Sequence, residues 1–205
     1  MPEDHYSERR LFGGAITCAL FHRFLDGSEI RQVPDNQELC MDPARDESLI
    51  FELLEYKHEV PDEGSAAWFL QDLATEQEAS DLALFEQSSV IDSPNLHFNG
   101  VPTVMHTALG QMSISKGRQG REARNVVKVY LANIRLKGVG TDVLITGYEP
   151  ILINPLSESA RTVGSGLVAP ATESGILPML PMSEVFKLAI STFRVHDWGL
   201  FGAPM

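Results

Sequence analysis

The sequence has few cysteines, no long apolar run and few basic residues, and these shortages argue against three classes of protein. It has two cysteines, Cys18 and Cys40, which are too few for a disulfide framework and predict a reducing compartment; a single bridge between them stays an open alternative. No run approaches the roughly 20 apolar residues that span a bilayer, and residues 1–10 hold no apolar stretch, so we expect neither membrane insertion nor a secretory signal. Basic residues number 16 against 28 acidic ones, and the net charge of -12 argues against nucleic acid as a partner.

The composition that is present is typical of a globular domain. Apolar residues make up 43% of the 205-residue chain and charged residues 21%, so a core can form without covalent crosslinks. We predict a flexible polar tail over residues 1–10 and a single domain over residues 11–205. We expect the domain to be a monomer.

Charge is unevenly distributed along the chain. Residues 35–92 contain sixteen Asp and Glu but only Arg45 and Lys57, whereas residues 116–137 contain seven Lys and Arg and one acid, Glu122. Such separation can create a field that steers a charged partner. The alternative, that the acidic face serves only solubility, stays open.

Several apolar runs rich in β-branched and aromatic residues predict strands, and two amphipathic segments predict helices. The expected strands cover residues 15–21, 38–41, 48–56, 82–91, 102–114, 126–136 and 142–148. The strand at 126–136 is apolar on both sides, which indicates a central strand covered on both faces. Ser65 and Ser183 are candidate N-caps for helices over residues 66–74 and 184–193. Many strands with two helices indicate an α+β fold with a mostly antiparallel sheet.

No combination of residues in the sequence predicts catalysis. The six histidines are scattered and no C-x-x-C is present, so we expect no metal or cofactor. Gly164-Ser165-Gly166 lacks the outer spacing of a nucleophile turn, and we interpret residues 163–182 as a loop. Residues 116–121 are glycine-rich and basic, but a strand follows instead of the helix that a phosphate loop requires, which favours a solvated basic loop.

Two short blocks of the sequence form a recognisable motif. Residues 11–16 read LFGGAI and residues 31–38 read RQVPDNQE. This combination resembles the MOG family, the Ran guanine-nucleotide release factors. Residues 46–54, 66–73, 134–145 and 193–201 are similar to later segments of that family in the same order, so the resemblance covers residues 11–202.

The resemblance implies a fold and a function. The fold is an α/β/α sandwich whose antiparallel sheet carries helices on both faces. The function is binding of the GTPase Ran and promotion of guanine-nucleotide release, in support of nucleocytoplasmic transport. It also implies other Ran-binding proteins as further partners, location in the nucleus and cytoplasm, and no catalytic residues.

The resemblance also implies a site. By match to the motif, Asp35 and Glu38 are the acidic pair that binds the GTPase. The neighbours expected to share the site are Asn36, Gln37, Asp26 and Arg31. Independently, Pro34 favours extended backbone before it and Asp35-Asn36 is turn-like, so the carboxylates would sit on a rigid platform suited to Lys or Arg of a partner. The alternative is a turn in which Asp35 merely caps its own loop.

The sequence departs from the family pattern at a few positions. Gly27 replaces a valine, and Leu39-Cys40 stand where Val-Phe or Val-Tyr is common. Two other functions remain as alternatives. One is a trafficking adaptor on the same fold, for example for a membrane channel. The other is a photosystem-type extrinsic subunit; a transit peptide would favour it, and no transit peptide is seen. An enzyme would need a pocket with perturbed titratable groups.

Overall fold

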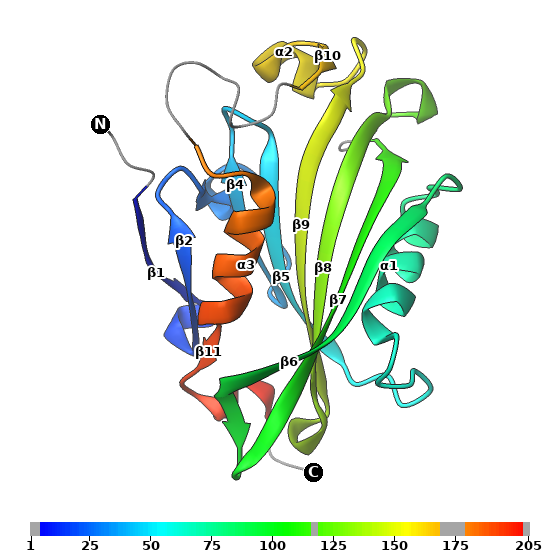
Figure 1. Ribbon diagram of the computed structural model, residues 1–205. Coiled ribbons are helices and arrows are strands. Elements are labelled where there is room, and N and C mark those ends of the chain that lie inside the picture. Colours follow the sequence, from blue (N-terminus) through cyan, green and yellow to red (C-terminus); the bar gives the residue numbers. More distant parts are fainter. Residues whose placement is uncertain (1–4, 116–118, 169–178, 203–205) are drawn as a thin grey trace.

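A large antiparallel sheet forms the centre of the molecule (Figure 1). The computed structural model describes residues 5–115, 119–168 and 179–202. The strands run in the order β3-β4-β5-β9-β8-β7-β6, and β10 pairs with β9. Their bounds are β3 Leu25–Asp26, β4 Gln37–Asp42, β5 Glu47–Glu55, β6 Ala83–Phe98, β7 Val101–Ile114, β8 Asn125–Leu136, β9 Thr141–Ile153 and β10 Gly166–Leu167. Every strand run predicted from the sequence lies within or overlaps a strand of the structure.

A second, three-stranded sheet packs beside the large one and was only partly predicted. Its order is β1-β2-β11, with bounds Tyr6–Leu11, Ile16–Phe21 and Arg194–Val195. The predicted flexible tail over residues 1–10 is wrong from Tyr6 onward, because β1 pairs antiparallel with all six residues of β2. The polar side chains of β1 misled the prediction: β1 is an edge strand that is mostly exposed, while β2 is buried throughout.

Strand β8 shows why the sheet is covered on both faces. Val127, Val129 and Leu131 belong to the core under helix α1 (Ser65–Glu76). Alternate residues Tyr130 and Ala132 belong to the core on the opposite face. Side chains of a strand alternate between faces, so one apolar strand serves two layers. The prediction of a central, doubly covered strand is confirmed.

The second face is shared between a helix and the small sheet. Helix α3 (Met182–Thr192) lies on this face between β2 and the large sheet (Figure 1). Val185, Phe186, Ala189 and Ile190 form its buried stripe, and Phe193 at its C-cap is fully buried. The fold is therefore α+β, with α1 on one face and α3 on the other, as predicted.

Both predicted N-cap residues are wrong. Helix α1 begins at Ser65 itself, after Gly64 in the left-handed region at φ 78°. Helix α3 begins at Met182 after Pro181, whose φ of -66° is already suited to a helix and which has no N–H to satisfy. The N-caps are thus Gly64, one residue before Ser65, and Pro181, two residues before Ser183.

The remaining predictions concern the loop near the end and the cysteines. Strands β8 and β9 form an antiparallel hairpin, and Gly140 in its connection has a φ of 60°. Residues 163–182, predicted as a loop, include the end of α2 (Ser159–Val163) and all of β10. Residues 169–178 of this loop and residues 116–118 of the basic loop lie outside the described residues.

Both cysteines are buried and unpaired. No helix among the described residues is long and apolar enough to cross a membrane.

Candidate functional site

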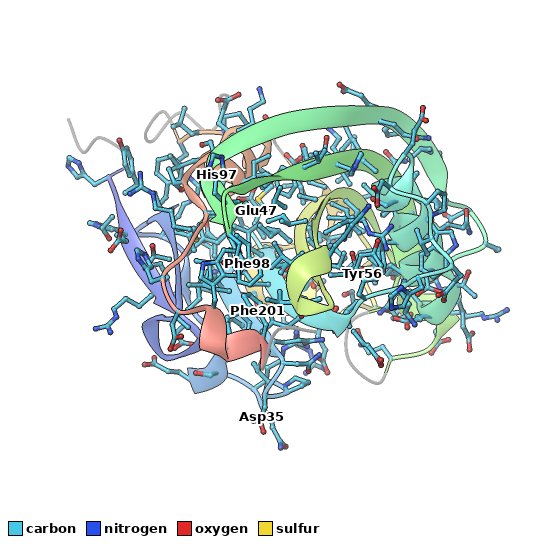
Figure 2. All side chains as sticks on the ribbon, turned by 90° about the horizontal axis from the view of Figure 1, so that it is seen from below. Asp35, Glu47, Tyr56, His97, Phe98 and Phe201 are labelled. Atoms are coloured by element: carbon cyan, nitrogen blue, oxygen red, sulfur yellow. The ribbon has the colours of Figure 1, made fainter. Side chains whose placement is uncertain are left out.

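The predicted acidic motif forms a tight turn that leads into β4. The Gln37 N–H donates to the Pro34 carbonyl at 2.9 Å, and the exposed Asp35 and Asn36 lie at the tip. Asn36 fixes the turn to β5, because its carbonyl accepts from Leu53 N–H at 2.9 Å and its Nδ2 donates to Leu53 O at 3.1 Å. Asp35 projects away from the body of the molecule at one end of the sheet (Figure 2). The turn is thus closed by backbone and by Asn36, which leaves the Asp35 carboxylate facing solvent.

The next two motif residues point to opposite faces of β4. Gln37 donates through Nε2 to Glu52 Oε1 on β5 at 2.7 Å. Glu38 is half-buried on the other face, where its Oε1 accepts from the Phe12 backbone N–H at 2.6 Å. This hydrogen bond joins the two sequence blocks of the motif, which are 26 residues apart. The acidic pair is therefore not equivalent: Asp35 is presented to solvent and Glu38 is engaged within the fold.

The Phe12 backbone explains why Glu38 is needed there. Phe12, Gly13 and Gly14 have φ values of 49°, 67° and 94°. Left-handed backbone is unfavourable for a residue with a Cβ, by about 1–2 kcal/mol for Phe12, and glycine tolerates it. A Cβ on Gly14 would also lie 2.6 Å from Arg10 Nη2. The Glu38 carboxylate helps to hold this strained turn by satisfying the Phe12 N–H.

Asp26 lies beside the motif on β3, which pairs with β4. Its Oδ1 accepts from Ser28 N–H at 2.9 Å, and hydrogen bonds from the Ser28 side chain and backbone lower the pKa of the Asp26 carboxyl. The following residue, Gly27, is buried against Leu39, and a Cβ at Gly27 would overlap the Leu39 side chain. The departures from the family pattern at Gly27 and Leu39 thus lie in contact, and a larger residue at position 27 would need a smaller one at position 39.

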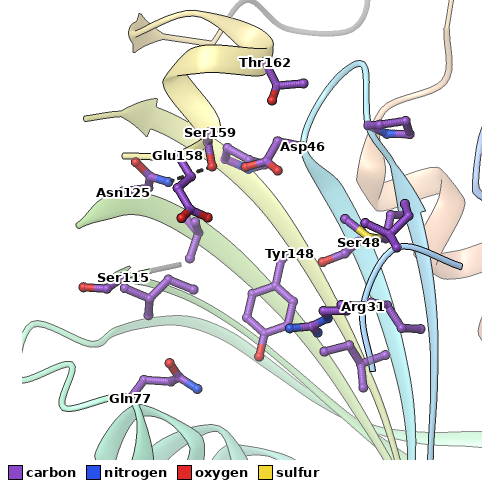
Figure 3. A pocket seen from close by; sticks show the side chains of 18 residues that line it. Arg31, Asp46, Ser48, Gln77, Ser115, Asn125, Tyr148, Glu158, Ser159 and Thr162 are labelled. Carbon is purple, nitrogen blue, oxygen red and sulfur yellow. Dashed lines mark hydrogen bonds between the residues drawn. The ribbon is translucent and has the colours of Figure 1, made fainter. Parts of the chain in front are cut away.

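Arg31 lies apart from the acidic turn, at the edge of a groove of about 660 Å³ (Figure 3). The groove lies on the α1 side of the sheet, over the strands that α1 leaves uncovered. Its walls are the loop after β3, the end of α1 and the region of α2. The residues around it include Ile30, Arg31, Leu39, Met41, Asp46, Ser48, Ile50, Gln77, Val127, Tyr148, Pro150, Glu158 and Thr162. Arg31 extends toward Tyr148, whose phenol has a raised pKa because of burial.

The structure thus arranges the predicted site residues in three places. Asp35 and Asn36 form the turn, Gln37 and Glu38 fix the start of β4, and Asp26 and Arg31 belong to the segment that runs from β3 to the turn. Sequence reasoning missed the groove. Ser48, Ile50 and Glu52 alternate on β5 and could have indicated one face of a strand, but only the placement of α1 shows that this half of the face is uncovered.

Among the described residues, no three His, Cys, Asp or Glu side chains converge in a way that could hold a metal ion. The geometry offers an exposed carboxylate on a rigid turn and, from Arg31 and Leu39 onward, a half-apolar groove. Charged groups on rigid elements beside an apolar depression are features of surfaces that bind another protein. The molecule is thus an α+β domain that carries an exposed acidic turn before β4 and a groove on the α1 face of its large sheet.

Comparison with known proteins identifies the family. Residues 9–150 match the model of the family described as Ran-interacting Mog1 protein. A protein of Danio rerio named Ran guanine nucleotide release factor is 33% identical over 95% of this chain and 99% of its own length. A protein of Dictyostelium discoideum named probable Ran guanine nucleotide release factor is 28% identical over 96% of each. The chain belongs to the Mog1 family.

The fold agrees with this assignment. The crystal structure of the Saccharomyces cerevisiae Ran-binding protein Mog1p superposes with a TM-score of 0.65, covering 98% of this chain and 100% of the other at 22% identity. At that identity the similarity concerns the fold. It confirms the predicted α+β architecture built on a large antiparallel sheet.

Proposed function

We propose that this protein binds the GTPase Ran and promotes release of its guanine nucleotide, in support of nucleocytoplasmic transport. The observation that carries the proposal is the exposed Asp35 carboxylate on a turn fixed by Asn36, in a chain that matches Ran guanine nucleotide release factors over nearly its whole length. Because the turn already fixes the backbone that carries Asp35, the backbone loses little entropy when the carboxylate meets a Lys or Arg of the partner.

The proposed residues have different roles. Asp35 contacts a cation of the GTPase. Asn36 and Gln37 hold the turn against β5, and Glu38 positions it through the Phe12 N–H. Asp26 and Arg31 flank the contact on the segment before the turn. Glu38 is thus a positioning residue in this scheme, whereas Asp35 touches the partner.

The mechanism follows from linkage. A GTPase holds its nucleotide through a phosphate loop, a lysine and a magnesium ion. A binding protein promotes release only if it binds the nucleotide-free or loosened GTPase more tightly than the loaded form. Asp35 would do so by engaging a cation that otherwise supports the phosphates. Excess nucleotide must then weaken the complex by the same factor.

The test is release of a fluorescent guanine nucleotide from Ran. Wild-type protein should accelerate release to a saturating rate, and Asp35→Ala should reduce both the acceleration and the affinity for Ran. Asp72→Ala is the matched control, because Asp72 is also exposed but lies on α1. If the Asp35→Ala variant accelerates nucleotide release as much as wild-type protein does, the turn is not part of the Ran-binding site. Tight binding of wild-type protein without acceleration would replace the exchange function by that of a passive Ran-binding adaptor.

The proposal extends to the state of the protein in cells. We expect a monomer without a reaction centre of its own, present in both nucleus and cytoplasm. Support for the location comes from relatives named nuclear import protein, such as that of Schizosaccharomyces pombe, which is 30% identical over 69% of this chain. Sedimentation equilibrium tests the monomer, and imaging of the tagged protein tests the location.

A further inference from the structure

The groove beside Arg31 has an apolar floor that the fold leaves partly uncovered. Met41, Ile50 and Tyr148 are half-buried on adjacent strands, so a partner could still cover part of their surface. At the rim Ile30 is 57% exposed. A volume of about 660 Å³ is in the range of sites that enclose a ligand or one or two large side chains.

The groove and the acidic turn are joined by strand β4. Strand β4 begins at the turn, and its alternate residues Leu39 and Met41 belong to the groove. Arg31 and Asp35 are four residues apart in the sequence, so their Cα atoms lie within about 14 Å of each other. A typical interface buries about 800 Å² on each partner, which is large enough to include both features. One partner can therefore contact the turn and the groove together.

The charges around the groove indicate the chemistry of its occupant. Asp46 and Glu158 belong to the groove, and Glu52 and Glu76 lie near enough to Tyr148 to raise its pKa further. Among the described residues that line the groove, Arg31 is the one cation. An apolar floor with mostly acidic surroundings suits an apolar side chain that has basic neighbours.

We propose that the groove receives an apolar anchor side chain, flanked by Lys or Arg, from the same Ran molecule that the Asp35 turn binds. The inference rests on the proposed function and adds a second contact to it. Burial of one large apolar side chain in a pocket of this kind is typical of interface residues that dominate affinity. The acidic turn would then supply orientation and the groove a large part of the affinity.

The test combines methyl NMR with a matched pair of variants. In protein labelled at its methionine methyl groups, addition of Ran should shift the Met41 signal, while buried Met112, in the core under α1, serves as the internal reference. Ile30→Ala should raise the Kd for Ran at least about fivefold. Phe85→Ala is the control, because Phe85 is 55% exposed but lies on β6 at the other edge of the sheet.

The outcomes separate this inference from the proposed function. If wild-type protein does not bind Ran, both fail. If Ran binds and requires Asp35, but the Met41 signal does not move and Ile30→Ala is neutral, the groove inference alone is overturned. A Met41 shift that grows with protein concentration in the absence of Ran would assign the groove to a second copy of this chain and also overturn the inference.

Discussion

Asp35 and Glu38 are three residues apart, but the fold gives their carboxylates different surroundings. Asp35 is exposed at the tip of a turn, whereas Glu38 is half-buried and accepts a hydrogen bond from Phe12. Loss of partner binding in a Glu38 variant can therefore have two causes: removal of a charge that meets the partner, or collapse of the Phe12 turn. A conservative substitution distinguishes the two.

We expect Glu38→Ala to destabilise the fold by about 1–3 kcal/mol, because the half-buried Phe12 N–H loses its acceptor. Glu38→Gln keeps an oxygen acceptor and should recover most of that stability, while Asp35→Ala should leave it unchanged. Urea unfolding monitored by circular dichroism measures all three. If Glu38→Gln is stable and binds Ran normally, Glu38 is a positioning residue; equal stability of Glu38→Ala and wild type would contradict the structural role of the hydrogen bond.

His106 is a buried histidine close to charged side chains on neighbouring elements. It is 6% exposed, and its Nδ1 has no hydrogen-bond partner in the described part of the chain. Burial lowers the pKa of its imidazole; Arg135 lowers it further, and Asp62 and Glu63 act in the opposite direction. Because the folded pKa lies below the unfolded value, the stability contribution is complete above pH 6.5 and is lost as the pH falls through the folded pKa.

We therefore expect the free energy of unfolding to fall as the pH drops below 6.5, with a slope of up to about 1.4 kcal/mol per pH unit from this one group. His106→Gln should flatten the pH dependence, since glutamine does not titrate. His22→Gln, at an exposed histidine, is the control and should keep the wild-type slope. Urea unfolding at a series of pH values measures the slopes, and identical slopes for His106→Gln and wild type would show that another group is responsible.

Strand β1 supports neighbouring elements of the fold, although its sequence is polar. It covers one edge of β2, and Tyr6 packs edge-to-face on Phe21 with ring centroids 5.8 Å apart. Arg9 donates from Nη2 to the Phe24 carbonyl at 2.5 Å. Immediately after β1 follows the Phe12 turn that Glu38 holds, so the strand also positions the motif.

Deletion of residues 1–10 should consequently cost at least about 2 kcal/mol of stability, because β2 loses its pairing strand and Phe21 becomes exposed. Deletion of residues 1–4, which ends before β1, is the control. Thermal unfolding of the two truncated proteins compares them directly. A chain that tolerates loss of residues 1–10 as well as loss of residues 1–4 would show that β1 contributes little to the fold.

At the scale of the whole molecule, the charge separation seen along the chain is partly cancelled in space. Arg121 pairs with Glu78 at 2.9 Å, and Arg135 pairs with Asp62 at 3.2 Å, so the basic segment meets the acidic one. Arg135 also pairs with the buried Asp142 at 3.0 Å. The net charge of -12 remains, and with it a long-range attraction for a basic partner surface.

Association with Ran should accordingly slow as salt rises, with a severalfold drop in on-rate between about 0.05 and 0.5 M, because screening shortens the range of the field. Asp35→Lys should reduce this dependence more than Asp72→Lys if the turn faces the partner. Stopped-flow mixing at several salt concentrations gives the rates. Rates that stay flat across this range would assign the acidic charge to solubility alone.

The sequence by itself determined the fold class, the central strand and the location of the motif, because hydrophobic periodicity and turn residues act over a few neighbouring positions. Strand β8 is the clearest case: its two apolar faces are visible in the residues and both are buried in the fold. The motif could be recognised as a unit for the same reason, since residues 31–38 are contiguous.

Other features were decided only by tertiary structure, because they depend on contacts between distant segments. The pairing of β1 with β2, the hydrogen bond from Phe12 to Glu38 and the open half of the sheet beside α1 each require the chain to be folded. In the sequence, the polar residues of an edge strand look like those of a flexible tail. A carboxylate that accepts a hydrogen bond also looks like a free one, because its donor comes from a distant segment. The sequence thus delimited the motif, and the fold gives its two carboxylates different surroundings: Asp35 is exposed, and Glu38 accepts a hydrogen bond from Phe12.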